Sequence, residues 1–295
     1  MLLDSVVEEV YAYRVFRGEG ERILAELESV SGFTVVPLLF GVRRYIDARA
    51  VDSIYTVLRG LGSVGRLGIV LFSVGGDIDE AYLLARHLQG LVGERLVVYV
   101  PRFAKSAATL LACAGDEVAM LPVAELGPID PVLYDEKRGR YVPLQSILEI
   151  IDMLAAKQVP RDMLREILDR IPVLELGDYK RAVEHNIELT AKILSARMLR
   201  EDPDKARKVA ENLASYKQHG AAITPRDAEE LGLKVRVVEG REAELLWKLH
   251  QLWVKNVIGV EELAEPNPEP IEFRLGKGLV LTTAPGEVVE EAKKR

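Results

Sequence analysis

Short apolar runs of strand length alternate with segments of helical periodicity along the first half of the chain. The strand-like runs are 35–40, 67–74, 96–100 and 117–120, and the helical segments are 52–61, 79–91 and 106–114. Within 79–91, the apolar residues Leu83, Leu84, Leu88 and Leu91 fall near the 3.6-residue period, as expected of a helix packed on a sheet. Repeated strand–helix units predict parallel strands joined by crossover helices.

From about residue 145 the pattern changes to consecutive helices with few strand signals. These helices are predicted at 145–157, 161–171, 176–200 and 203–216. Thr224 and Pro225 are typical of a helix start and predict a short helix at 225–231, followed by a strand at 234–238 and a helix at 241–254.

The two ends of the chain differ from the middle in composition. Residues 1–32 read as a charged helical lead-in, and the proline-rich stretch 265–270 reads as a linker. We expect the tail beyond it to dock weakly or on a partner. The predicted organisation is therefore a lead-in (1–32), an α/β domain (33–240), and a C-terminal helix, linker and tail (241–295).

Composition narrows the class of protein. With 295 residues, 48% of them hydrophobic, the chain can bury one large core or two modest ones, and its net charge of −7 disfavours nucleic acid as the main partner. Cys113 is the single cysteine, which excludes a disulfide framework within one chain. The four scattered histidines show no HExxH pattern, so neither a metal nor another cofactor is expected. No run approaches the roughly 20 apolar residues of a membrane span, and the acidic start is unlike a secretory signal, so we expect a cytoplasmic protein.

Two strand-to-helix turns carry the candidate chemistry. In the first, Gly75 and Gly76 offer backbone N–H groups that can form an oxyanion hole, although an ordinary turn explains them equally well. In the second, Ser106 stands at the start of a helix rich in alanine, where a serine is more often a simple cap. A donor-rich glycine turn together with this serine favours acyl transfer by a serine hydrolase.

The base that would activate the serine is ambiguous. A desolvated lysine can serve, and the downstream candidates are Lys157, Lys180 and Lys217. A histidine base would have to come from the helical half or from the loop at His219. Asp130 follows Ser106 by 24 positions, but aspartate before proline is also common in turns. Lys105 is a candidate to stabilise an anion near Ser106, with plain solvation as the alternative.

Several strings in a fixed order resemble one known family over roughly residues 20–240. They are RYID (44–47), SVGG (73–76), KSAATL (105–110), AGDEV (114–118), LGPIDP (126–131), AENLAS (210–215) and ITPRDAEELGL (223–233). This set resembles the Clp-peptidase/crotonase superfamily, and specifically the serine dehydrogenase proteinase family related to signal peptide peptidase A.

The resemblance implies an α/β spiral of β–β–α units with a helical C-terminal half, assembled as a homo-oligomer. It implies a nucleophile at Ser106 and oxyanion donors at Gly75, Gly76 and the N–H of Ala107. Lys180, beside a tyrosine, looks like the lysine base of signal peptide peptidases.

The likeness to Clp peptidases differs at the base. Asp130 stands where Clp peptidases have a histidine, so a Clp-type triad is not expected. His219 is the rival base or a residue that supports the base.

The sequence thus predicts a serine peptidase that cleaves unfolded or apolar peptide segments through an acyl-enzyme on Ser106. Two alternatives remain open at this point: a crotonase-type acyl-CoA enzyme, and a non-catalytic oligomeric scaffold of the same fold.

Overall fold

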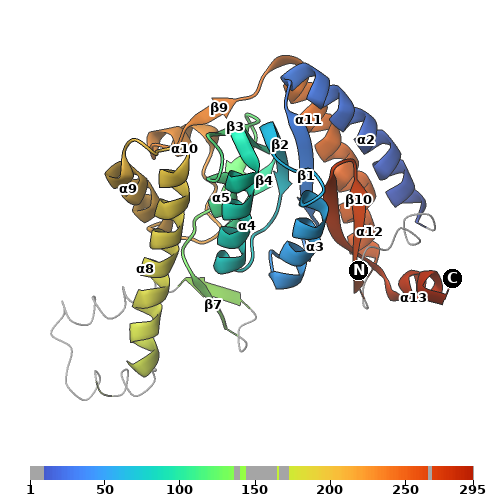
Figure 1. Cartoon of the computed structure of the whole chain (residues 1–295). Helices are drawn as coiled ribbons and strands as arrows, with labels where there is room; N and C mark the ends of the chain where they lie inside the picture. The colour runs from blue at the N-terminus through green and yellow to red at the C-terminus, as the bar shows by residue number, and fades with distance from the viewer. Residues whose placement is uncertain (1–9, 136–139, 144–164, 166–172, 265–267, 295) are drawn as a thin grey trace.

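The computed structural model describes residues 10–135, 140–143, 165, 173–264 and 268–294. The predicted helices at 145–157 and 161–171 lie outside these residues, apart from residue 165. Figure 1 shows the described chain as one central sheet with helices on both faces.

Seven strands form the main sheet in the order β10-β11-β1-β2-β3-β5-β9. They are β1 (Thr34–Phe40), β2 (Val64–Phe72), β3 (Val92–Val100), β5 (Glu117–Met120), β9 (Val235–Val237), β10 (Pro268–Leu275) and β11 (Gly278–Pro285). All neighbours pair in parallel except the edge strand β10, which runs antiparallel to β11. The expected α/β class with a mostly parallel sheet is confirmed.

Helices cover both faces of the sheet. They are α2 (Tyr11–Ser31), α3 (Ala48–Leu58), α4 (Ile78–Leu91), α5 (Ala107–Ala112), α8 (Val173–Ala196), α9 (Pro203–Ala214), α10 (Pro225–Glu230), α11 (Gly240–Trp253), α12 (Gly259–Leu263) and α13 (Gly286–Lys294), with a π-helical turn at Val254–Ile258. Helices α2 and α11 lie together on one side, while α4, α5 and α8 cover the other (Figure 1). None of the helices in the described part of the chain is long and apolar enough to cross a bilayer.

Polar side chains fix where α3 and α4 begin. The Asp47 carboxylate accepts a hydrogen bond from Ala50 N, and the Asp77 carboxylate accepts two, from Asp79 N and Glu80 N. These caps satisfy N–H groups that have no acceptor inside their own helix. Both helices therefore start at the carboxyl edge of the sheet, the edge where open parallel sheets carry their binding sites.

A second, shorter ladder follows this carboxyl edge. β4 (Phe103–Ala104) pairs with β6 (Glu125–Leu126), and isolated bridges extend the row on both sides: Ile46 with Gly76, Ser73 with Ala104, and Leu126 with Ile223. Strands β1, β2 and β3 are thus each followed by a short bridging segment and then a helix, which is the β–β–α unit. A separate hairpin, β7 (Val132–Asp135) and β8 (Arg140–Pro143), leaves the ladder at its end.

The prediction for the C-terminal tail was wrong. Residues 268–270, expected to be linker, are the start of β10, and the tail is not loosely docked but forms a hairpin inside the main sheet. β11 pairs with β1 through Leu38 and Leu279 and their neighbours. Prolines are tolerated here because β10 is an edge strand, where a missing N–H costs no ladder hydrogen bond.

Candidate active site

Ser106 occupies a strained turn between β4 and α5. Its φ of 53° and ψ of −124° make it the one non-glycine residue with positive φ among those described. Such a conformation costs on the order of 1–3 kcal/mol and persists where the surroundings enforce it. Although Ser106 stands at the N-cap of α5, its hydroxyl makes no capping hydrogen bond. The simple cap is therefore not its role, and Oγ is left available.

The Gly75–Gly76 turn packs directly against the serine turn. A Cβ on Gly75 would lie 2.8 Å from Ser106 Cβ and 3.3 Å from Ala107 N, and φ is +108° at Gly75 and +152° at Gly76. Glycine is required at both positions because a side chain would meet backbone there and because L residues avoid these dihedrals.

The backbone N–H groups beside Ser106 differ in their availability. The N–H of Gly75 donates to Ser73 Oγ at 3.1 Å, so Gly75 is not the free donor that the sequence suggested. Gly76 makes no N–H hydrogen bond to any described residue, and Ala107 is the first residue of α5, so it has no acceptor in its own helix. The N–H groups of Gly76 and Ala107 are therefore open donors beside Ser106.

Asp130 and His219 form a hydrogen-bonded pair although 89 positions separate them. His219 Nδ1 lies 3.0 Å from Asp130 Oδ1, with 1% of the Asp130 side chain exposed and 25% of the His219 side chain. Because a carboxylate only accepts, Nδ1 donates, and in the neutral ring Nε2 is left as the acceptor. The second carboxylate oxygen of Asp130 is buried with no partner among the described residues.

Side chains next to the serine hold the Asp130 and His219 loops in place. The single proton of Thr109 Oγ1 has two acceptors within reach, Ala104 O at 2.8 Å and Gly127 O at 2.7 Å, and the same oxygen accepts from Gly127 N. Lys105 Nζ forms an ion pair with Glu125 and donates to Ala221 O at 3.1 Å, two residues after His219. The Lys105 ammonium is thus engaged in joining these loops and does not stand free beside Ser106.

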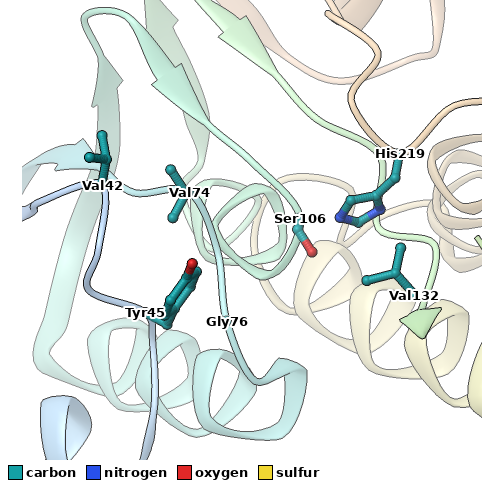
Figure 2. Close-up of a pocket in the computed structure, with 7 residues that line it drawn as sticks. All are labelled: Val42, Tyr45, Val74, Gly76, Ser106, Val132 and His219. Atoms are coloured by element: carbon teal, nitrogen blue, oxygen red, sulfur yellow. The ribbon is translucent and has the colours of Figure 1, made fainter. Parts of the chain in front are cut away.

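One cavity of about 480 Å³ brings these groups together. Its lining residues are Val42, Tyr45, Val74, Gly76, Ser106, Val132 and His219. Figure 2 shows the Ser106 hydroxyl and a ring nitrogen of His219 on facing sides, with the apolar side chains around the opening. The volume lies within the usual range for small-ligand and peptide-side-chain pockets. Val42, Tyr45 and Val132 were not predicted as site residues, since single apolar residues carry no signal in a sequence.

The predicted lysines do not come to this cavity. Lys180 is an exposed residue of α8 and Lys217 is an exposed loop residue, and neither lines the cavity. Lys157 lies outside the described residues. Within the described ranges there is no group of three or more potential metal ligands, and burial raises the pKa of the Cys113 thiol to about 12, so that thiol is unreactive.

Proteins and structures similar to this chain were found at low identity. The uncharacterized protein MJ0137 of Methanocaldococcus jannaschii is 27% identical over 256 residues, covering 83% of both chains, and MJ1495 of the same organism is 23% identical, covering 79% of this chain and 73% of its own. Among solved structures, a mutant of the 1510-N membrane-bound stomatin-specific protease in complex with a substrate peptide gives a TM-score of 0.43 at 17% identity, covering 70% of this chain and 74% of its own. The ClpP protease catalytic domain from Plasmodium falciparum gives 0.39 at 13%, covering 70% and 85%. These structural likenesses are too low to transfer any residue role.

A family model gives the assignment. The model of the ClpP-like SDH-type serine proteinases matches residues 27–272, which include the whole carboxyl-edge ladder and every residue that lines the cavity. The chain belongs to the ClpP-like SDH-type serine proteinase family and is a serine peptidase.

Proposed function

We propose that this peptidase cleaves peptide bonds with Ser106 as nucleophile, His219 as general base and Asp130 as the group that orients His219. The observation that carries the proposal is the Asp130–His219 hydrogen bond, made by a histidine that lines the same cavity as Ser106. A serine hydroxyl needs an adjacent base at neutral pH, and a base needs a partner that holds its tautomer.

The reaction follows from these positions. His219 Nε2 accepts the Ser106 hydroxyl proton while Oγ attacks the scissile carbonyl carbon, and the N–H groups of Gly76 and Ala107 donate to the oxyanion that forms. The tetrahedral intermediate collapses as His219 donates its proton to the leaving amine, which gives the acyl-enzyme. Water, deprotonated by His219, then attacks the acyl carbon, and Ser106 leaves as the regenerated alcohol.

Asp130 supports this cycle through its burial. When His219 gains a proton it becomes a cation 3.0 Å from a carboxylate that is almost fully shielded from water. Charge pairs are worth more where water is excluded. Asp130 therefore stabilises the imidazolium of the transition state as well as the Nδ1–H tautomer of the resting enzyme.

His219 is preferred to Lys180 as the base on two grounds. His219 lines the cavity beside Ser106, whereas Lys180 is exposed on α8 and does not line the cavity. The second ground is that a histidine base at 219 accounts for the aspartate at position 130. The aspartate sits where Clp peptidases have a histidine, and it pairs with a histidine supplied later in the chain.

The lining of the cavity is apolar apart from the proposed catalytic groups. Val42, Val74 and the ring of Tyr45 lie on one side, and Val132 lies beside His219 (Figure 2). Such a lining favours a peptide with an apolar side chain next to the scissile bond, because it can offer no charge partner to an acidic or basic one. We infer that the substrates are unfolded or apolar peptide segments. The homo-oligomer and the cytoplasmic location expected from the sequence stay predictions.

The test is cleavage of fluorogenic peptides that differ only in the residue before the scissile bond. We expect turnover with leucine or phenylalanine there and little with aspartate, with activity lost in Ser106→Ala. Retention of the parental rate by Ser106→Ala would overturn the nucleophile assignment. Stabilisation of the protein by acyl-CoA without any peptide cleavage would favour the acyl-CoA enzyme instead.

A further inference from the structure

One loop, residues 41–46 after β1, supplies part of the apolar lining of the cavity. Its residues Val42 and Tyr45 line the cavity together with Val74 and Val132, which come from other segments. Its last residue is bound to the glycine turn, since Ile46 N donates to Gly75 O at 2.9 Å and Asp77 N donates to Ile46 O at 2.7 Å. The loop is therefore fixed to the glycine turn at its end, while Val42 near its start lines the cavity.

A buried carboxylate lies under the start of the loop. Glu261 of α12 is fully buried; its Oε2 accepts from Val42 N at 2.8 Å and its Oε1 accepts from Thr282 Oγ1 at 2.8 Å. Backbone N–H of Thr283 also donates to this carboxylate. The side chain of Glu261, 219 positions from Val42 in the sequence, thus joins the cavity loop to the C-terminal strand β11.

The space for this carboxylate is provided by a glycine. A Cβ on Gly41 would fall onto the Glu261 carboxylate, so no larger residue fits at position 41 without displacing it. Gly41 N donates in turn to Leu281 O at 2.7 Å, next to Thr282. The glycine and the glutamate are therefore complementary, although neither carries any signal of this pairing in the sequence.

The loop has a second buried attachment at Arg44. Its guanidinium donates to Ile271 O and Thr282 O and forms an ion pair with Glu272 at 2.9 Å, with about a tenth or less of either side chain exposed. Arg44 and Glu261 both hold the loop against the β10–β11 hairpin. Thr282 and Thr283 lie beyond residue 272, where the family match ends. The attachment therefore depends on a part of this chain that the family match does not include.

Burying a carboxylate is unfavourable unless its hydrogen bonds are satisfied, and here burial raises the pKa of Glu261 while three donors oppose that rise. A group of this kind is costly for stability alone, where an apolar residue would serve. The donors to this carboxylate, Val42 N, Thr282 Oγ1 and Thr283 N, come from two segments, the cavity loop and β11. We therefore expect Glu261 to fix the position of the cavity loop.

We propose that Glu261 is a positioning residue for substrate binding, which holds Val42 and the 41–46 loop in the conformation that accepts an apolar peptide side chain. The proposal rests on the proposed function for the identity of the ligand, a peptide. It assigns Glu261 no contact with the substrate and no part in proton transfer.

The test compares Glu261→Ala and Gly41→Ala with Glu261→Gln. Glu261→Ala removes the carboxylate that accepts from Val42 N. Gly41→Ala displaces that carboxylate, because the added Cβ takes up its space. Glutamine can keep its carbonyl on Val42 N and donate to Thr282 Oγ1. Glu262→Gln, at the next and exposed position of α12, is the matched control.

For peptides with leucine before the scissile bond, we expect Glu261→Ala and Gly41→Ala to raise KM by about tenfold with kcat changed less than threefold. Labelling of Ser106 by a small fluorophosphonate should stay within threefold of the parent, because the reagent does not need the apolar pocket. Glu261→Gln and Glu262→Gln should keep the parental KM. An unchanged KM in folded Glu261→Ala, or an equal fall in kcat and labelling rate in all variants at 261, would overturn the proposal.

A binding measurement separates this proposal from the catalytic one. In a Ser106→Ala background, fluorescence anisotropy of a labelled apolar peptide should show a Kd about tenfold weaker with Glu261→Ala, whether or not Ser106 is the nucleophile. If Glu261→Ala fails to fold, Thr282→Val replaces it. Thr282→Val removes one of the three donors to Glu261 and nearly keeps the shape of the side chain. It should weaken peptide binding about threefold. Unchanged binding would count against the proposal.

Discussion

The two sides of the cavity are built in different ways. On the nucleophile side, Gly76 and Ser106 lie in short strand-to-helix turns, and His219 is held by its hydrogen bond to Asp130. The substrate side, Val42 and Tyr45, is held from below by a hairpin and a helix more than 200 positions away. Chemistry and substrate selection can therefore be altered separately in this chain.

Loss of the nucleophile or the base should give the largest effects. Ser106→Ala and His219→Ala should each lower kcat by about 10⁴-fold or more for every peptide, because members of such a unit fail together. The double variant should be no slower than either single variant. Steady-state cleavage of apolar and polar peptides measures this, and additive losses in the double variant would contradict a shared step.

Asp130→Asn should have the next largest effect. The amide can present an N–H to His219 Nδ1, which favours the tautomer that carries the proton on Nε2, so kcat should fall by about 10²–10⁴-fold. KM for the apolar peptide should stay within about threefold, since Asp130 does not line the cavity. If Asp130→Asn kept the parental kcat, the Asp130–His219 hydrogen bond would have no role in catalysis.

On the substrate side, the buried Arg44–Glu272 pair gives a stability test. Arg44→Met removes a guanidinium from a buried carboxylate, and the free energy of unfolding should fall by about 3–5 kcal/mol. Adding Glu272→Leu should restore part of that loss, because the carboxylate no longer needs a partner. Urea unfolding of the two variants measures both values. A double variant as unstable as Arg44→Met would show that the ion pair is not the source of the loss.

The sequence predicts the nucleophile side of the cavity better than the substrate side. The serine turn and the glycine turn each lie within a few residues, so Ser106, Gly75 and Gly76 stand out as local patterns. Asp130 and His219 were both named from the sequence but not as a pair, because 89 positions of chain separate them. Lys180 was favoured for its neighbours, and only the fold shows that it is exposed.

The substrate side was not predictable by the same reasoning. Nothing near Val42 indicates that Glu261 lies beneath it, and the prolines at 268 and 270 favoured a linker over an edge strand. Long-range pairing of this kind depends on which sheet edge remains open, and no local pattern of residues specifies that. The prediction for the C-terminal tail was wrong because this segment forms the β10–β11 hairpin of the main sheet.

The smallest effect is expected in acid, on the nucleophile side. His250 packs on Phe72, the last residue of β2, and on Trp253, and its burial, together with the charge of Arg102, lowers its pKa from 6.5 to about 4. Between pH 6.5 and 4 the unfolded chain binds a proton that the folded chain does not. The free energy of unfolding should therefore fall as pH drops through this range, by at most about 3 kcal/mol. His250→Phe should flatten this part of the pH–stability curve measured by urea unfolding, and an unchanged slope would place the titrating group elsewhere.

The most direct test of the account is the rate at which a fluorophosphonate labels Ser106, mapped by mass spectrometry in the parent, His219→Ala and Lys180→Ala. If His219 is the base, Ser106 should be labelled in the parent. The labelling rate should be lower by at least a hundredfold in His219→Ala and within twofold of the parent in Lys180→Ala. Loss of labelling in Lys180→Ala with full labelling in His219→Ala would contradict it.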